Sequence, residues 1–102
     1  MTRDEPIPLD DNRLLFLSVF RNKNGDIDKY SIDVEKASDS HYELSTNEMR
    51  RLENYLMDKY RKRDLVAGLK EFFRSNNESD LRNLFDRLEI EYNQFHFDDY
   101  DW

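Results

Sequence analysis

The stretch that decides the fold is RLLFLSVFRNKNGDIDKYSIDVE, residues 13–35. Near its centre stands Asn24-Gly25, a pair typical of a tight type I′ hairpin turn, in which both central residues need a positive φ. A two-residue turn here pairs residues whose numbers sum to 49. The facing pairs on one side of the sheet are then all apolar: Leu15–Val34, Leu17–Ile32 and Val19–Tyr30. We therefore expect a hairpin of residues 13–21 and 28–35.

The two predicted strands differ on their second face. The first strand places apolar side chains there and the second places polar ones: Leu14, Phe16 and Phe20 against Lys29, Ser31 and Asp33. A strand that is apolar on both faces is typical of the interior of a sheet, so we expect the first strand there and the second nearer an edge. Because a lone hairpin is marginally stable, a third strand is needed, and EIEYNQFHF (89–97) is the candidate.

Three amphipathic helices are expected after a polar loop at 36–44. Ser45-Thr46-Asn47-Glu48 has the pattern of a capping box, and Asn77 with Asp80 indicates another helix start. Apolar residues recur at helical spacing in three segments: about 46–62, 64–75 and 78–88. This order of elements predicts an α+β fold, in which an N-terminal antiparallel β-hairpin, with a C-terminal third strand to complete it, packs against two to three α-helices.

The length and composition fit one domain with a thin core. The chain has 102 residues, of which 38% are charged, compared with about 25% in typical domains. We divide it into a flexible acidic arm (1–12), a single α+β domain (13–97) and an acidic-aromatic C-terminal tail (98–102). The absence of cysteine excludes disulfides and zinc sites built on thiolates.

The sequence also bears on location. No apolar run approaches the roughly 20 residues that cross a bilayer, and the start MTRDEPIPLDD lacks the apolar stretch of a signal peptide. We therefore expect a cytoplasmic protein that does not bind a membrane.

Signatures of catalysis are weak. His96 with Asp98 and Asp99 offers three nearby metal ligands, but not at the spacing of a helical metal motif. The two glycines lie in the expected turn and in a helix, so no phosphate-cradling loop is predicted. We expect no catalytic residue, no metal and no cofactor, and hence no enzyme.

The net charge of −7 is distributed unevenly. Residues 1–45 hold 6 basic and 10 acidic groups (net −4), residues 46–75 hold 8 and 5 (net +3), and residues 76–102 hold 2 and 8 (net −6). An acidic chain repels nucleic acid and attracts basic partners. The exception is the run KYRKR, which can contact phosphates, complement a helix dipole or hold an acidic segment through Lys59, Arg61, Lys62 and Arg63.

The segment from residue 89 to residue 102 holds five acidic and five aromatic residues and no basic one. Phe95 and Phe97 can finish a core strand, but a Trp near a chain end has little reason to be there unless it binds something. Tyr and Trp are frequent interface hot spots, and aspartates steer and pair basic partners. The candidate partner-binding residues are Tyr92, Phe97, Asp98, Asp99, Tyr100, Asp101 and Trp102.

The ending FDDYDW resembles the aromatic-acidic ends of some ribonuclease-colicin immunity proteins. It is also similar to the acidic tips of single-stranded-DNA-binding proteins, which end on a hydrophobic residue and recruit partners. Both resemblances cover fewer than ten residues. They imply an acidic, aromatic end that binds protein.

Two functions are expected from these features. The first is a small acidic non-catalytic protein that inhibits or neutralises a basic nucleic-acid-handling protein, such as a nuclease. It would be of the toxin-immunity or phage counter-defence type, would mimic nucleic acid and would not bind nucleic acid itself. The alternative is an adaptor or regulatory subunit that uses the basic residues 59–63 and the tail to join partners, nucleic acid included.

Overall fold

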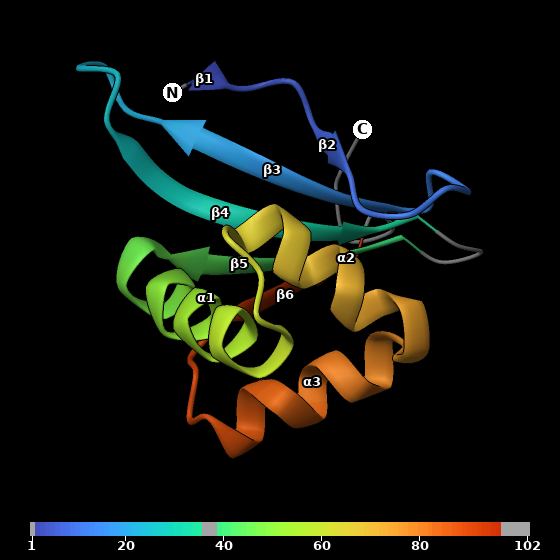
Figure 1. Cartoon of the computed structure of the whole chain (residues 1–102). Helices are drawn as coiled ribbons and strands as arrows, with labels where there is room; N and C mark the ends of the chain where they lie inside the picture. Colours follow the sequence, from blue (N-terminus) through green and yellow to red (C-terminus); the bar gives the residue numbers. More distant parts are fainter. Residues whose placement is uncertain (1, 36–38, 97–102) are drawn as a thin grey trace.

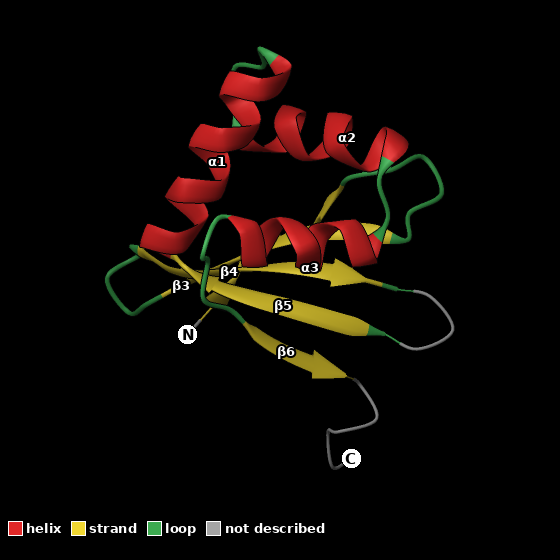
Figure 2. Cartoon of the chain, turned by 90° about the horizontal axis from the view of Figure 1, so that it is seen from below, coloured by secondary structure: helices red, strands yellow, loops and turns green. Residues whose placement is uncertain are grey.

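The computed structural model describes residues 2–35 and 39–96. In this part the chain forms a six-stranded antiparallel sheet and three helices, and all three helices lie on one face of the sheet (Figures 1 and 2). The strands are β1 (Thr2–Arg3), β2 (Ile7–Pro8), β3 (Leu15–Arg21), β4 (Ile27–Val34), β5 (Ser40–Ser45) and β6 (Asn93–His96). The helices are α1 (Thr46–Tyr60), α2 (Leu65–Ser75) and α3 (Glu78–Arg87). The predicted α+β class, with a hairpin packed on helices, is confirmed.

The predicted pairing of β3 with β4 is confirmed, but the predicted turn is wrong. Leu15 faces Val34, Leu17 faces Ile32 and Val19 faces Tyr30. The loop is longer than a type I′ turn, because the Asn22 backbone N–H donates to the Asp26 carbonyl at 2.9 Å and, within this loop, only Gly25 has a positive φ, of 85°. The side chain of Asn22 holds this loop by accepting from the backbone N–H groups of Asn24 and Asp26. A register shift between Phe20 and Arg21 then restores the expected pairs.

The order of the strands differs from the expectation at two points. Strand β4 lies between β3 and β5, so the prediction that it is near an edge is wrong. Residues 40–44, which were expected in a polar loop, belong to β5, because Tyr42 and Leu44 alternate with polar residues and are buried in the core. The predicted C-terminal strand exists as β6, but it pairs with β5 rather than with the hairpin.

The core lies between the sheet and the helices. Its largest fully buried side chains come from β4, β5 and all three helices, and they include Ile32, Tyr42, Leu52, Leu69 and Phe85. Helices α1 and α2 approach each other closely at Gly68, where an added Cβ would lie 3.0 Å from the Cβ of Leu56. This close approach is the reason for a glycine within α2.

The predicted helix starts are confirmed. The Ser45 side chain accepts from the Glu48 backbone N–H at 3.2 Å, and Asn77 with Asp80 forms a reciprocal capping box. The Glu48 carboxylate does not complete the box at α1; it accepts instead from the backbone N–H of Glu91 at 3.0 Å. The start of α1 is thereby tied to the segment that leads into β6.

The segment predicted as an arm lies against the sheet where the structure describes it. Strands β1 and β2 both pair with β3, and Leu9 is buried in the core. The side chain of Arg21 donates to Asp4 at 3.1 Å and holds the segment to β3. Residues 7–13, at the end of this segment, form one wall of the surface groove described below.

Candidate functional site

Tyr92 is the one predicted partner-binding residue that falls within the described residues; Phe97, Asp98, Asp99, Tyr100, Asp101 and Trp102 lie outside them. Its ring is half-buried and packs against the rings of Phe85, with centroids 4.8 Å apart, and Tyr42, with centroids 5.7 Å apart. Tyr92 is thus anchored on the core and held beside the first residue of β6. The proposed contact of Tyr92 with a partner stays a prediction.

An acidic hollow of about 560 Å³ opens beside Tyr92, between the start of α1 and strands β5 and β6. Three carboxylates from different parts of the chain line it: Glu43 of β5, Glu48 in the first turn of α1, and Glu91 just before β6. The remaining lining residues in the part of the chain that the structure describes are Ser45, Ile90, Tyr92 and Asn93, none of which is a Lys or Arg. We call Glu43, Glu48, Glu91 and Tyr92 the acidic edge.

Nearby cations neutralise the acidic edge only in part. The ammonium of Lys29 lies 2.9 Å from the Glu43 carboxylate, and the guanidinium of Arg51 lies 3.5 Å from that of Glu48. Glu91 is exposed, and its carboxylate forms no ion pair with any residue in the described ranges. The edge therefore keeps negative charge that the fold itself does not compensate.

The basic run 59–63 is divided by the end of α1. The helix ends at Tyr60, and Arg61 follows in the left-handed conformation with φ 58°. The Lys59 ammonium lies over the rings of Tyr55 and Tyr60, whereas that of Lys62 lies 3.9 Å from Glu71 of α2. All four basic residues are exposed, but Lys59 and Lys62 line two different cavities and Arg61 and Arg63 line neither of these.

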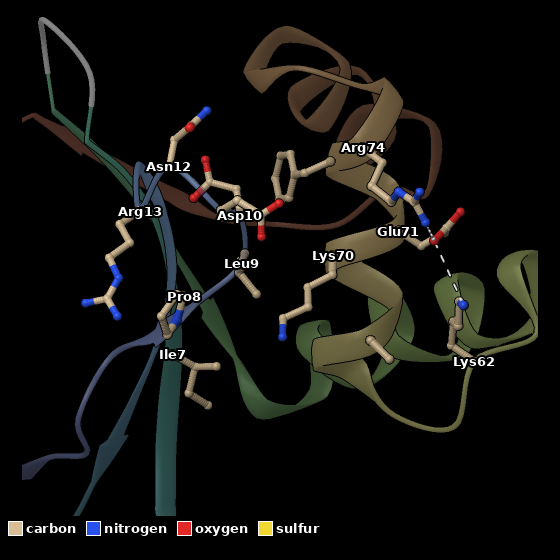
Figure 3. A pocket seen from close by; sticks show the side chains of 13 residues that line it. Ile7, Pro8, Leu9, Asp10, Asn12, Arg13, Lys62, Lys70, Glu71 and Arg74 are labelled. Carbon is tan, nitrogen blue, oxygen red and sulfur yellow. Dashed lines mark hydrogen bonds and ion pairs between the residues drawn. The ribbon is translucent and has the colours of Figure 1, made fainter.

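The cavity of Lys62 is a broad groove of about 1010 Å³ between residues 7–13 and α2 (Figure 3). Much of its charge is already paired. The Asp10 carboxylate accepts from the backbone N–H groups of Leu14 and Leu15, and Glu71 pairs with Lys62 and Arg74. Figure 3 shows Lys70 extending from α2 toward the N-terminal segment. The sequence does not indicate this groove, because residues 1–12, which supply most of one wall, were expected to form a flexible arm.

A buried polar cluster lies on the face of the sheet that no helix covers. The Asp33 carboxylate accepts from the hydroxyls of Ser18 and Ser31, both at 2.6 Å, and lies 2.6 Å from Nδ1 of His41. Both serines donate to the carboxylate rather than to the imidazole, so the cluster is not a nucleophile-base pair. Its hydrogen bonds satisfy polar groups that the sheet buries.

A second network surrounds the buried hydroxyl of Tyr42. This hydroxyl donates to Glu78 and accepts from Arg82 at 3.1 Å and Gln94 at 3.3 Å, so it joins β5, α3 and β6. Burial, and then the hydrogen bond to Glu78, raise the pKa of Tyr42 to about 12. A phenol that stays neutral and fully bonded at physiological pH stabilises the fold. The sequence does not indicate this network, because Tyr42 was expected in the polar loop 36–44.

The described residues offer neither a metal cluster nor a membrane-spanning helix. Of the weak metal triad, Asp98 and Asp99 lie outside the described residues, and the residues that are described contain no cluster of three or more His, Asp or Glu that could hold a metal ion. Within the same residues, no helix has the length and apolar character needed to cross a membrane. Comparisons of the chain with protein-family models, with curated proteins and with solved structures give no match.

Proposed function

We propose that this protein is a small acidic, non-catalytic binding protein that neutralises a basic nucleic-acid-handling protein, such as a nuclease. Toxin-immunity and phage counter-defence proteins work in this way. The observation that carries the proposal is the acidic edge, where three carboxylates surround a hollow beside an anchored tyrosine and, among the described residues, no Lys or Arg lines the wall. The edge also leads, through β6, into the acidic-aromatic segment 97–102.

The hollow suits a basic side chain from a partner. Its volume of about 560 Å³ lies within the roughly 300–1,000 Å³ of typical binding pockets. An arginine that entered it could pair with Glu91 and lie over the ring of Tyr92, because guanidinium groups both bind carboxylates and stack on aromatic faces. The net charge of −7 would in addition speed the encounter with a basic partner.

The same chemistry supports mimicry of nucleic acid. Carboxylates spaced beside flat rings present a basic groove with negative groups next to stacking surfaces, as phosphates beside bases do. A partner that holds the acidic edge in its nucleic-acid groove cannot hold nucleic acid there at the same time. Binding of this protein and binding of nucleic acid are therefore mutually exclusive under the proposal.

The alternative of an adaptor stays a prediction. It requires the basic residues 59–63 to act together, and the division of Lys59 and Lys62 between two cavities does not favour that arrangement. No observation on the described residues supports the adaptor more strongly than the acidic edge supports the inhibitor.

The test is capture of a partner from the native host by the tagged protein and by two charge-matched variants. In the edge variant, Glu43→Gln, Glu48→Gln and Glu91→Gln remove three charges while keeping side-chain size. In the control variant, Glu5→Gln, Asp26→Asn and Asp28→Asn remove three charges at exposed positions elsewhere.

We expect the wild type and the control variant to capture the same basic, nucleic-acid-binding protein, and the edge variant to bind it at least about 10-fold more weakly, about 1.4 kcal/mol. Equal capture by all three proteins would contradict the assignment of the edge. Capture of a partner that is neither basic nor able to bind nucleic acid would contradict the assigned class of partner.

A further inference from the structure

A small cavity of about 180 Å³ lies among the three helices, away from the acidic edge. The buried side chains of Phe72 and Leu84 form its apolar part. Tyr55 and Lys59 of α1 and Arg87 at the end of α3 bring polar groups to the same space. Of these, only Lys59 belongs to the basic run of the sequence; Arg87 is distant in the chain and joins it through the packing of the helices.

The hydroxyl of Tyr55 is held in an unusual way. Its oxygen accepts from the Lys59 ammonium at 3.3 Å and from the Arg87 guanidinium at 2.8 Å. A phenolic oxygen that accepts twice keeps one proton to donate. No acceptor for that proton is found among the residues that the structure describes. The hydroxyl lies at an exposed position, so its proton can be donated to solvent or to a bound group.

The two cations are positioned but not neutralised. The Lys59 ammonium lies 5.6 Å and 5.5 Å from the ring centroids of Tyr55 and Tyr60, and the Arg87 guanidinium lies 5.6 Å from that of Tyr55. Cation–π contacts hold a cation in place without cancelling its charge. Within residues 2–35 and 39–96, neither cation forms an ion pair with a carboxylate.

The single carboxylate among the lining residues does not fill this role. Asp80 accepts the backbone N–H of Asn77 at 2.8 Å in the capping box of α3, so it is committed to the start of that helix. Two exposed cations and a phenolic O–H therefore converge on one space, where the one lining carboxylate is already hydrogen-bonded to a helix start. The amide of Asn83, which also lines the cavity, adds a further donor group.

From this convergence we infer that the cavity is a binding site for one oxyanionic group, a phosphate or a carboxylate, held by Tyr55, Lys59 and Arg87. Charge-assisted hydrogen bonds from a guanidinium and an ammonium are the contacts that such groups prefer. The volume, below the roughly 300 Å³ of pockets for whole small molecules, suits a single group rather than a nucleotide. The inference goes beyond the proposed function, because it concerns a different surface and a ligand of opposite charge.

The test is titration of the isotope-labelled protein with inorganic phosphate, and separately with acetate, at constant ionic strength, followed by NMR of the backbone amides. Saturable shifts centred on Tyr55, Lys59, Asn83 and Arg87 are expected. Arg87→Gln should weaken binding at least about 10-fold, and Tyr55→Phe, which removes only the hydroxyl, about 5-fold. Lys70→Gln, an exposed cation of the other groove, should leave binding unchanged.

Saturable binding of either anion supports the inference. The anion that binds more tightly identifies the chemical class of the bound group, a phosphate or a carboxylate. Shifts that rise linearly with concentration for both anions would overturn it. An Arg87→Gln protein that gives a dispersed, folded spectrum and binds as the wild type does would overturn it as well.

Discussion

Asp33 and Glu91 are both carboxylates at the β-sheet, and they stand in opposite situations. Asp33 is at the centre, 5% exposed, and two serine hydroxyls and a histidine nitrogen lie within 2.6 Å of its oxygens. Glu91 lies just before the last strand in the sheet order, exposed, and its carboxylate has no ion-pair partner within the described residues. A charge that the fold surrounds with donors stabilises the fold, whereas a charge that the fold leaves uncompensated beside a hollow is available to a partner.

The largest effect is expected where a carboxylate is buried without donors. Leu17→Asp places one against Ile32 on the helix-covered face, and it should lower the free energy of unfolding by at least about 4 kcal/mol. That is a large part of the roughly 5–15 kcal/mol of a domain. Thermal unfolding measures the loss, with Lys23→Asp in the exposed loop as the control. An unchanged melting temperature for Leu17→Asp would be incompatible with the packing of the hairpin.

Removal of the buried carboxylate should have a slightly smaller effect. Asp33→Ala leaves the hydroxyls of Ser18 and Ser31 buried without their acceptor, and we expect a loss of about 3 kcal/mol. Glu91→Ala should change stability by less than about 0.5 kcal/mol, because its carboxylate is exposed. Denaturant unfolding of both variants measures the difference. Equal losses of unfolding free energy in the two variants would contradict the distinction between a carboxylate that stabilises the fold and one that is available to a partner.

The surroundings of Asp33 also show how much of the β-sheet the sequence could predict. The register of β3 and β4 follows from alternation and was predicted correctly. The position of β4 was not, because its polar second face, with Ser31 and Asp33, was interpreted as typical of a strand nearer an edge. Their partners Ser18 and His41 lie on the neighbouring strands β3 and β5, and nothing in the sequence shows that the sheet brings them together.

The sequence likewise predicted only part of the candidate site. Tyr92 was noticed from its acidic surroundings, but Glu43 and Glu48 reach it only through the pairing of β5 with β6 and the position of α1. Arg87 likewise meets Lys59 only through the packing of α3 on α1. Local patterns predict elements and their faces, and convergence of distant side chains requires the tertiary fold.

A third prediction uses the pH dependence of stability. The pKa of Tyr42 is about 12 in the folded protein and about 10 when unfolded, so above pH 10 the unfolded chain loses this proton first. The stabilisation from this group is therefore fully present below pH 10. The free energy of unfolding then falls by about 2 to 3 kcal/mol as the pH rises from 10 toward 12. Urea unfolding at several pH values measures this loss. In Tyr42→Phe the decline should be smaller by that amount, and an identical decline would contradict the buried network.

A fourth prediction concerns the segment beyond the described residues. Deletion of residues 98–102 should leave the melting temperature nearly unchanged and weaken partner binding by at least about 2 kcal/mol. Changing Asp98, Asp99 and Asp101 to Asn should chiefly slow association, whereas changing Tyr100 and Trp102 to Ala should chiefly speed dissociation. Undiminished affinity of the truncated protein would remove these residues from the binding site.

The smallest expected effect is on nucleic acid itself. At physiological salt we expect no measurable binding to a generic duplex or single strand, because the net charge of −7 opposes it. Fluorescence anisotropy with labelled oligonucleotides measures this. Micromolar or tighter binding that falls steeply with salt would favour the adaptor over the inhibitor.

Competition for the captured partner tests the central claim most directly. The partner is first loaded with labelled nucleic acid, and the release of that label is followed as this protein is added. The account predicts full release by the wild type, with at least about 10-fold more of the Glu43→Gln, Glu48→Gln, Glu91→Gln protein needed for the same release. A ternary complex that keeps the nucleic acid bound, or release by the edge variant at the wild-type concentration, would contradict it.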